Sequence, residues 1–146
     1  MGDLSEHFSK KKFECPCCHQ VIINKKLIEK LEKVRTAIGN NPINITSGYR
    51  CKKYNTSIDG DINSPHLVGL AADTQCKYSI IDYALMASKV GGIRLGIYPN
   101  HLHIDIIEPH PSKFWLVKKY GGKYIYSKYE NDLKSFLKGV IGNVID

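Results

Sequence analysis

The longest regular pattern of apolar residues is helical and lies in the first third of the chain. After Asn24, apolar side chains recur at spacings of three and four residues, which is the period of a helix that buries one face. Asn24 is suited to cap the first turn and Gly39 to end the last one. The pattern predicts a core-packing helix over residues 24–39, with its Lys and Glu side chains in solvent. Its apolar positions are Leu27, Ile28, Leu31, Val34 and Ile38.

Four shorter segments predict strands, because aliphatic and β-branched residues are concentrated in them and turn residues bound them. A second helix, over residues 79–89, separates the first two strands from the last two, with Ser79 and Asp82 in positions like those of a capping box. The order helix, strand, strand, helix, strand, strand predicts an α+β fold with a small, mostly antiparallel sheet and helices packed on one side of it. The predicted strands cover residues 42–46, 70–76, 93–98 and 101–106.

The remaining segments are less regular. Residues 55–63 form a polar stretch that predicts a loop, and residues 115–126 predict a hairpin around Gly121 and Gly122. A final helix is expected near the C-terminus, with Leu133, Phe136, Leu137 and Val140 on one face. At 146 residues and 42% hydrophobic content, the chain has the mass of one domain with a core of its own, and we expect a single domain over residues 1–146.

The predicted strand over residues 101–106 contains three side chains of types that can bind a metal. His101, His103 and Asp105 alternate with aliphatic residues, so the three polar side chains share one face and the other face belongs to the core. Two His residues at alternate positions are unusual on a merely solvated face, although an exposed strand with incidental His residues would read the same way.

A second candidate stretch covers residues 64–73. It contains His66 and Asp73, which are metal-ligand types, with Gly69 between them, where the chain can adopt a positive φ or approach another segment closely. An ordinary loop that leads into a strand, with Asp73 as a turn residue, is the alternative. Imidazoles and carboxylates in both stretches predict a metal site if the fold brings the stretches together.

Charge and hydropathy narrow the range of partners. The net charge of +7 and pI near 9.1 favour polyanions such as nucleic acid or the anionic polymers of a bacterial wall, or serve solubility alone. The basic residues are scattered and no nucleic-acid recognition motif is present, so a nucleic-acid partner is not favoured. No apolar run reaches membrane-spanning length, and the N-terminus lacks the layout of a signal peptide. We therefore expect a soluble monomer made in the cytoplasm, with no membrane partner.

The five cysteines are unevenly placed. Cys15, Cys17 and Cys18 form a cluster next to His19, while the other two stand alone at positions 51 and 76. An odd number without a secretion signal favours reduced thiols over a disulfide framework. The spacing of Cys15 and Cys18 is that of a zinc knuckle, which His19 or Cys51 would have to complete, and a Cys-rich turn that simply packs near the N-terminus is the alternative.

The two candidate stretches also resemble a known family. The order Ser64-x-His66-x-x-Gly69-x-Ala71-x-Asp73, followed by His101-x-His103, resembles the zinc D-Ala-D-Ala carboxypeptidase family, in particular its phage and viral peptidoglycan peptidases. The wider group includes lysostaphin-type peptidases and the hedgehog signalling domain. Residues 47–50, 96–99 and 114–115 fit the same pattern, so the resemblance extends from Phe8 to Trp115.

The resemblance implies a set of site residues. It places the Zn²⁺ ligands at His66, Asp73 and His103, on the face of the sheet. It also implies that Arg50 binds the substrate and that Ser64 helps to hold it. From the residues alone, Arg50 at the end of a strand is placed to grip a carboxylate, or to pair with an acidic neighbour at the surface.

This sequence departs from the family that it resembles at the position of the catalytic base. Many members of that family carry an Asp or Glu three positions before the last His ligand, and here that residue is Asn100, which cannot take a proton. His101 matches an active-site His of the lysostaphin and hedgehog branches and is therefore the predicted base. Asp105, on the same strand face, is predicted to orient an imidazole from behind.

By resemblance, the predicted function is hydrolysis of peptidoglycan stem peptides by a zinc peptidase of the D-Ala-D-Ala carboxypeptidase or endopeptidase type. The expected absence of a signal peptide fits an endolysin that acts on the wall after release, or an enzyme carried in a virus particle. The alternative is a zinc-containing binding module of hedgehog type without hydrolysis, which Asn100 favours.

Overall fold

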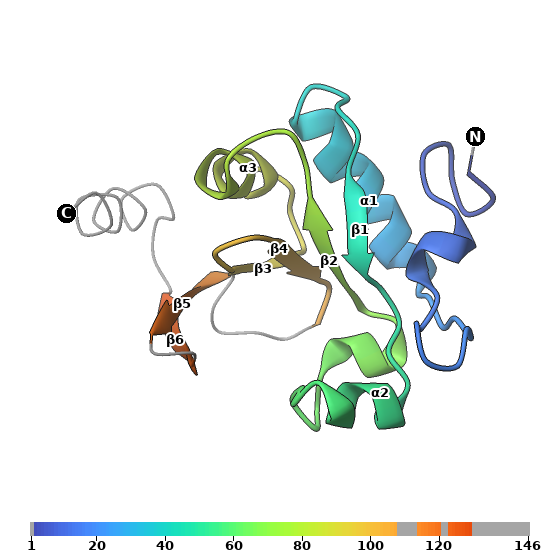
Figure 1. Cartoon of the computed structure of the whole chain (residues 1–146). Coiled ribbons are helices and arrows are strands. Elements are labelled where there is room, and N and C mark those ends of the chain that lie inside the picture. The colour runs from blue at the N-terminus through green and yellow to red at the C-terminus, as the bar shows by residue number, and fades with distance from the viewer. Residues whose placement is uncertain (1, 108–113, 121–122, 130–146) are drawn as a thin grey trace.

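The computed structural model describes residues 2–107, 114–120 and 123–129, the last two ranges by their backbone alone. The helices and strands follow in this order: η1 (Lys10–Phe13), α1 (Lys25–Ala37), β1 (Asn44–Ser47), α2 (Lys52–Ser57), η2 (Pro65–Val68), β2 (Ala71–Gln75), α3 (Ile80–Ala87), β3 (Arg94–Ile97), β4 (Leu102–Asp105), β5 (Phe114–Tyr120) and β6 (Lys123–Tyr129). Figure 1 shows the arrangement, with the strands in the middle and α1 and α3 beside them. The fold is α+β, as the sequence predicted.

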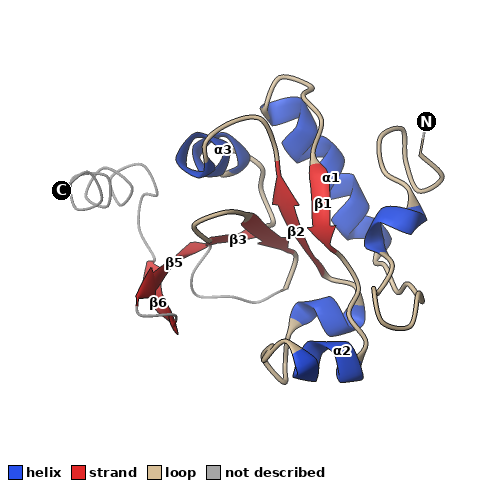
Figure 2. Cartoon of the chain, in the orientation of Figure 1, coloured by secondary structure: helices blue, strands red, loops and turns tan. Residues whose placement is uncertain are grey.

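The strands form one twisted sheet in the order β1-β2-β4-β3-β5-β6. Neighbours are antiparallel except for β3 and β5, which run parallel. A mostly antiparallel sheet lets each strand place alternate side chains on opposite faces, so one face can be apolar and the other can carry polar groups. In Figure 2 the strands follow one another across the molecule from β1 to β6.

One face of the sheet packs into the core. Ala72 of β2, Leu95 of β3 and Ile104 of β4 are paired across the three strands and are fully or almost fully buried. The apolar stripe of α1 and the inner face of α3 belong to the same cluster of buried side chains. The burial of this face leaves the opposite face of β2, β3 and β4 as the place where polar side chains can gather.

The helix predictions differ from the structure mainly at the ends and in one short element. Asn24 caps α1, and its side chain accepts a hydrogen bond from the backbone N–H of Lys26 at 2.8 Å. The loop predicted over residues 55–63 is wrong in its first part, because Lys52–Ser57 forms α2. This helix is too short and too polar to show an apolar period, so the sequence pattern does not reveal it.

The C-terminal predictions can be followed only in part. β5 and β6 pair as the predicted antiparallel hairpin, with Tyr120 opposite Lys123. The Gly121–Gly122 turn and the helix expected around Leu133 lie outside the described residues. Among the residues that the structure describes, no helix is long and apolar enough to cross a membrane.

Candidate metal centre

The polar face of the sheet carries a row of functional side chains. Asp73 of β2 and His103 of β4 are direct partners across the antiparallel pair, and Gly96 of β3 is the next partner of His103. Because glycine has no side chain, β3 does not cover His103 from that direction. The strand register therefore sets one carboxylate and one imidazole side by side.

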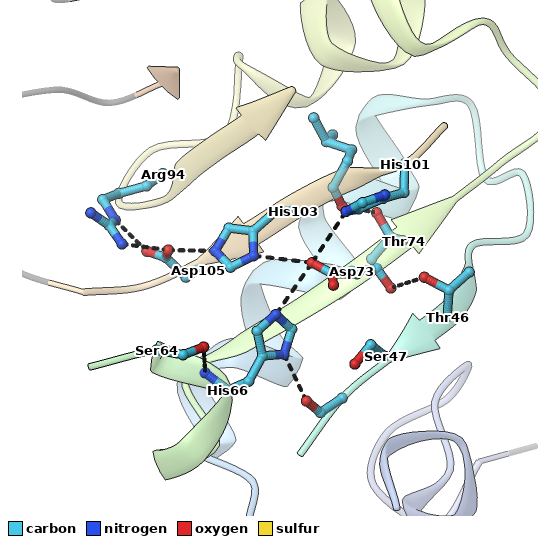
Figure 3. A network of polar contacts seen from close by, with 12 residues as sticks. Thr46, Ser47, Ser64, His66, Asp73, Thr74, Arg94, His101, His103 and Asp105 are labelled. Atoms are coloured by element: carbon cyan, nitrogen blue, oxygen red, sulfur yellow. Dashed lines mark hydrogen bonds and ion pairs between the residues drawn. The ribbon is translucent and has the colours of Figure 1, made fainter. Parts of the chain in front are cut away.

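His66 reaches the same point from outside the sheet. It lies on η2, whose turn ends at Gly69 immediately before β2. Its Nε2 is 3.2 Å from Asp73 Oδ1, and His103 Nδ1 is 3.0 Å from the same oxygen (Figure 3). The three residues are buried, with exposed fractions of 2% for His66 and 6% each for Asp73 and His103. The group could hold a metal ion, since the three ligand atoms lie within 4.8 Å of one another.

The hydrogen bond on the far side of the His66 ring decides which ring nitrogen carries the proton. The Gly48 carbonyl lies 2.7 Å from His66 Nδ1 and can only accept a hydrogen bond, so Nδ1 carries the proton. Nε2 of the neutral ring is then a lone-pair donor aimed at Asp73. An unprotonated imidazole nitrogen and a carboxylate oxygen that face each other repel one another unless a cation lies between them.

His103 is held by a buried carboxylate in the same way. Asp105 Oδ2 lies 2.7 Å from His103 Nε2, on the side of the ring that faces away from Asp73. Arg94 binds both oxygens of Asp105, with Nε at 2.6 Å from Oδ1 and Nη2 at 2.7 Å from Oδ2. A carboxylate behind a ligating imidazole fixes the ring orientation and raises its basicity, which is a common arrangement at metal sites.

Arg50 and His101 border this group. Arg50 Nη2 donates to Asp73 Oδ2 at 2.7 Å, and its Nε donates to Ser47 Oγ at 3.0 Å. His101 Nε2 is 3.8 Å from Asp73 Oδ1, and its ring stacks on that of Tyr98 with centroids 4.2 Å apart. Both side chains are partly exposed.

Comparison with known families agrees with this geometry. A family model described as Peptidase M15 matches residues 6–105, which is more than half of the chain. The chain belongs to the Peptidase M15 family. The matched segment contains every residue of the site described above. No curated protein matches the chain.

Peptidases of the M15 family depend on a metal, and the donors in this M15 chain suit one. One carboxylate and two imidazoles that converge from separate segments are the hard and borderline ligands that divalent metals such as zinc accept. A metal held by these three residues would keep coordination positions for water and substrate, as catalytic sites require. The chemistry of the residues present therefore fits the metal that the family implies.

Without a metal, the electrostatics of the group hold a proton on His103. Burial lowers the pKa of His103, but hydrogen bonds to Asp105 and Asp73 outweigh that effect and raise it to about 9. Burial lowers the pKa of His66, so this ring is neutral at pH 7. The nearby His66 and His103 rings keep the pKa of Asp73 well below its usual range despite its burial. One proton thus occupies the place that a metal would take.

This arrangement predicts that metal binding releases about one proton per ion near pH 7.5, because the ion displaces the proton on His103 Nδ1. The apparent affinity should weaken as the pH falls below about 9, by about tenfold per pH unit while a single proton competes. Asp105→Asn should reduce the proton release and weaken metal binding by about 10–100-fold. Calorimetric titration in buffers of different ionisation enthalpy measures both quantities. Asp82→Asn, at an exposed position of α3, serves as the control, and an Asp105→Asn protein that binds and releases protons like this control would contradict the role of Asp105.

Two residues set the position of His66. Ser64 caps η2, and its Oγ accepts the backbone N–H of His66 at 3.3 Å. Gly69 has a φ of +73°, and a Cβ at this position would lie 2.4 Å from the Ile22 carbonyl oxygen. The sequence predicted that Gly69 provides either a positive φ or a close approach, and the structure shows both.

Gly69→Ala should therefore destabilise the fold by more than about 1 kcal/mol, because the new Cβ meets backbone atoms in a strained conformation. The change should also weaken metal binding, since His66 must move with η2. Thermal unfolding with and without metal tests both effects. Gly91→Ala is the matched control, because a Cβ there meets open space and the φ is not positive. Equal melting temperatures for the two variants would show that Gly69 is not under this constraint.

The structure brings together the residues that the sequence singled out, but it gives some of them additional contacts. His66, Asp73 and His103 form one group, and Asp105 lies behind His103. Arg50 pairs with Asp73 of this group and not with an acidic neighbour at the surface, because both side chains are largely buried.

Other contacts of the site were not predicted. Arg94, the Gly48 carbonyl and the stacking of Tyr98 on His101 were missed. The one available signal for Arg94 is its charge within an otherwise apolar strand segment, at a position that faces Asp105 across the strand pair.

Proposed function

We propose that this M15 protein is a zinc-dependent peptidase that hydrolyses peptide bonds in the stem peptides of peptidoglycan, either as a D-Ala-D-Ala carboxypeptidase or as an endopeptidase. The observation that carries the proposal is the convergence of His66 Nε2, His103 Nδ1 and Asp73 Oδ1 on one point in a chain of this family. These three atoms are the proposed ligands. When bound, zinc supplies a hydroxide nucleophile at neutral pH and polarises the scissile carbonyl.

The proposed base is His101. Its Nδ1 lies 2.8 Å from Asn100 Oδ1, and if that amide oxygen accepts the Nδ1 proton, Nε2 is left with a lone pair directed toward Asp73. Burial lowers the pKa of His101, so the ring is neutral at pH 7 and can accept a proton from the attacking water. In this reading Asn100, which replaces the acid of many relatives, orients the base instead of acting as one.

Arg50 is the proposed anchor for the substrate. Its Nε and Nη2 are engaged by Ser47 and Asp73, while Nη1 has no partner among the described residues. A guanidinium fixed in this way can offer its remaining donors to a carboxylate of the substrate beside the scissile bond. Ser64, which caps η2 next to His66, is proposed to assist in holding the peptide.

The type of cleavage can be tested with a synthetic stem peptide that ends in D-Ala-D-Ala, offered with a free or an amidated C-terminus. If Arg50 holds the terminal carboxylate, the zinc-loaded protein should release D-Ala from the free peptide and should process the amide far more slowly. Equal rates for both peptides would favour an endopeptidase in which Arg50 holds another carboxylate. Binding without turnover of either peptide, with zinc present, would favour a binding module of hedgehog type and contradict the peptidase.

The proposed place of action is the bacterial wall, as for an endolysin or an enzyme carried in a virus particle. The net charge of +7 supports this, because a basic surface is attracted to the anionic polymers of that wall. The same attraction predicts that wall binding weakens as the salt concentration rises.

A further inference from the structure

A second cluster of metal-binding side chains lies apart from the His66 group. The thiols of Cys15, Cys18 and Cys51 lie within 4.8 Å of one another. Cys15 is buried, Cys51 is half-buried and Cys18 is exposed. A tetrahedral zinc site with Zn–S bonds of about 2.3 Å needs sulfur atoms about 3.8 Å apart, so the three thiols are already close to that spacing.

The backbone holds the first two cysteines in place. The Cys15 N–H donates to the Gln20 carbonyl at 2.9 Å, and the His19 N–H donates to the Cys15 carbonyl at 2.8 Å. His19 adopts a φ of +59°, which turns the chain back on itself directly after Cys18. This tight turn keeps Cys15 and Cys18 on the same side, as the spacing of a zinc knuckle requires.

The third thiol comes from the segment that carries Arg50. The Tyr49 N–H donates to the Phe13 carbonyl at 2.9 Å, so this segment runs alongside the chain just before Cys15. The Cys51 N–H lies 3.4 Å from Cys15 Sγ, and the Tyr54 N–H lies 3.4 Å from Cys51 Sγ. Backbone N–H groups that point at sulfur stabilise the thiolate, which is the form that binds metals.

The charge balance of Cys15 agrees with these contacts. Burial raises the pKa of its thiol, but N–H groups of Cys51, Cys18 and Cys17 outweigh that effect and lower the pKa to about 7. A buried thiol in an apolar site would show the opposite direction. Cys15 therefore lies in surroundings suited to a negatively charged sulfur.

A disulfide accounts for this cluster less well than a metal does. One disulfide would use two of the three thiols and leave the third beside it, whereas a metal uses all three at once. The five cysteines are free in the structure. The three thiols supply three of the four positions of a tetrahedral site.

We propose that Cys15, Cys18 and Cys51 form a second metal site that binds zinc through thiolates. The site is structural. It ties the turn at residues 15–20 to the segment of Arg50 and thereby holds the N-terminal region against the edge of the first site. This inference does not depend on the peptidase activity, because metal content is measured separately at each site.

Metal content and cobalt spectroscopy of the reduced full-length protein test the proposal. The unmodified protein should bind two ions, and its cobalt form should show a near-ultraviolet thiolate-to-cobalt charge-transfer band. The double variant His66→Ala and His103→Ala should keep one ion and the full band. Cys18→Ser combined with Cys51→Ser should keep one ion and lose the band. Cys76→Ser, outside the cluster, should bind two ions with the band unchanged.

A thiol-protection experiment covers the case in which the double cysteine variant does not fold. In the unmodified protein, zinc should slow the reaction of the clustered thiols with Ellman's reagent, while Cys76 reacts at the same rate with or without zinc. A strong chelator should restore the fast reaction. The proposal is overturned if the unmodified protein gives no charge-transfer band, or if zinc leaves the reactivity of these thiols unchanged.

Discussion

Replacing His66 with alanine is expected to lower the metal content by one ion per chain and to reduce peptide turnover by more than about 100-fold. Loss of a residue that only supports a metal ligand costs up to about 100-fold, and loss of the ligand itself should cost more. The reason is that, among the described residues, His66 Nε2 is one of three ligand atoms that converge at the site. Its removal leaves Asp73 and His103 free to form a hydrogen-bonded pair without a metal. Metal analysis and initial rates on a stem peptide measure the two effects.

The control for this variant is His7→Ala, which removes another imidazole. His7 contacts Glu32 of α1 and has no contact with the metal group, so the variant should keep both metal and turnover. If His66→Ala retained the same metal content as His7→Ala, with the cysteine cluster blocked or removed, the ligand assignment would be wrong.

His101→Ala is expected to separate metal binding from turnover. The metal content should remain unchanged, because Nε2 of His101 is 3.8 Å from Asp73 Oδ1 and is not among the three converging atoms. Turnover should fall by about 10²–10⁴-fold, the usual contribution of a general base. Asn100→Ala should have a smaller effect, since it loosens the orientation of the ring without removing it.

The pH profile adds a readout that a purely structural role would not change. Burial lowers the pKa of His101, and a base acts only when it is neutral. Activity should therefore be present at pH 7 and be lost on acidification, with the acid limb below the ordinary His pKa of about 6.5. The pH profile of His101→Ala should lack the acid limb that protonation of His101 produces. Full activity in His101→Ala would assign the base to another group.

Much of the fold follows from local patterns. The helical period after Asn24 predicts α1, the alternation of polar and aliphatic residues predicts β4, and short segments bounded by turn residues predict β2 and β3. Helix α2 does not follow from the sequence, since its six residues have no apolar stripe and its N-cap is a cysteine. Short polar helices are held by contacts with distant segments, which local patterns do not contain.

The candidate site, too, can be predicted from the sequence only in part. The imidazoles and carboxylates of the two candidate stretches predict a metal group, and the family resemblance selects His66, Asp73 and His103 among them. The exact partners depend on register: Asp73 faces His103, and Arg94 faces Asp105, only because β2, β4 and β3 pair as they do. In the same way, the sequence shows the spacing of Cys15 and Cys18, whereas only the fold brings Cys51 beside them.

Mass spectrometry of purified muropeptides tests the central claim most directly. The zinc-loaded protein is incubated with them beside a chelated sample and a His66→Ala sample. The loaded protein should remove one D-Ala residue or split a cross-link, and the two other samples should leave the muropeptides intact. Unchanged muropeptides with zinc bound at the His66, Asp73 and His103 group would contradict that claim.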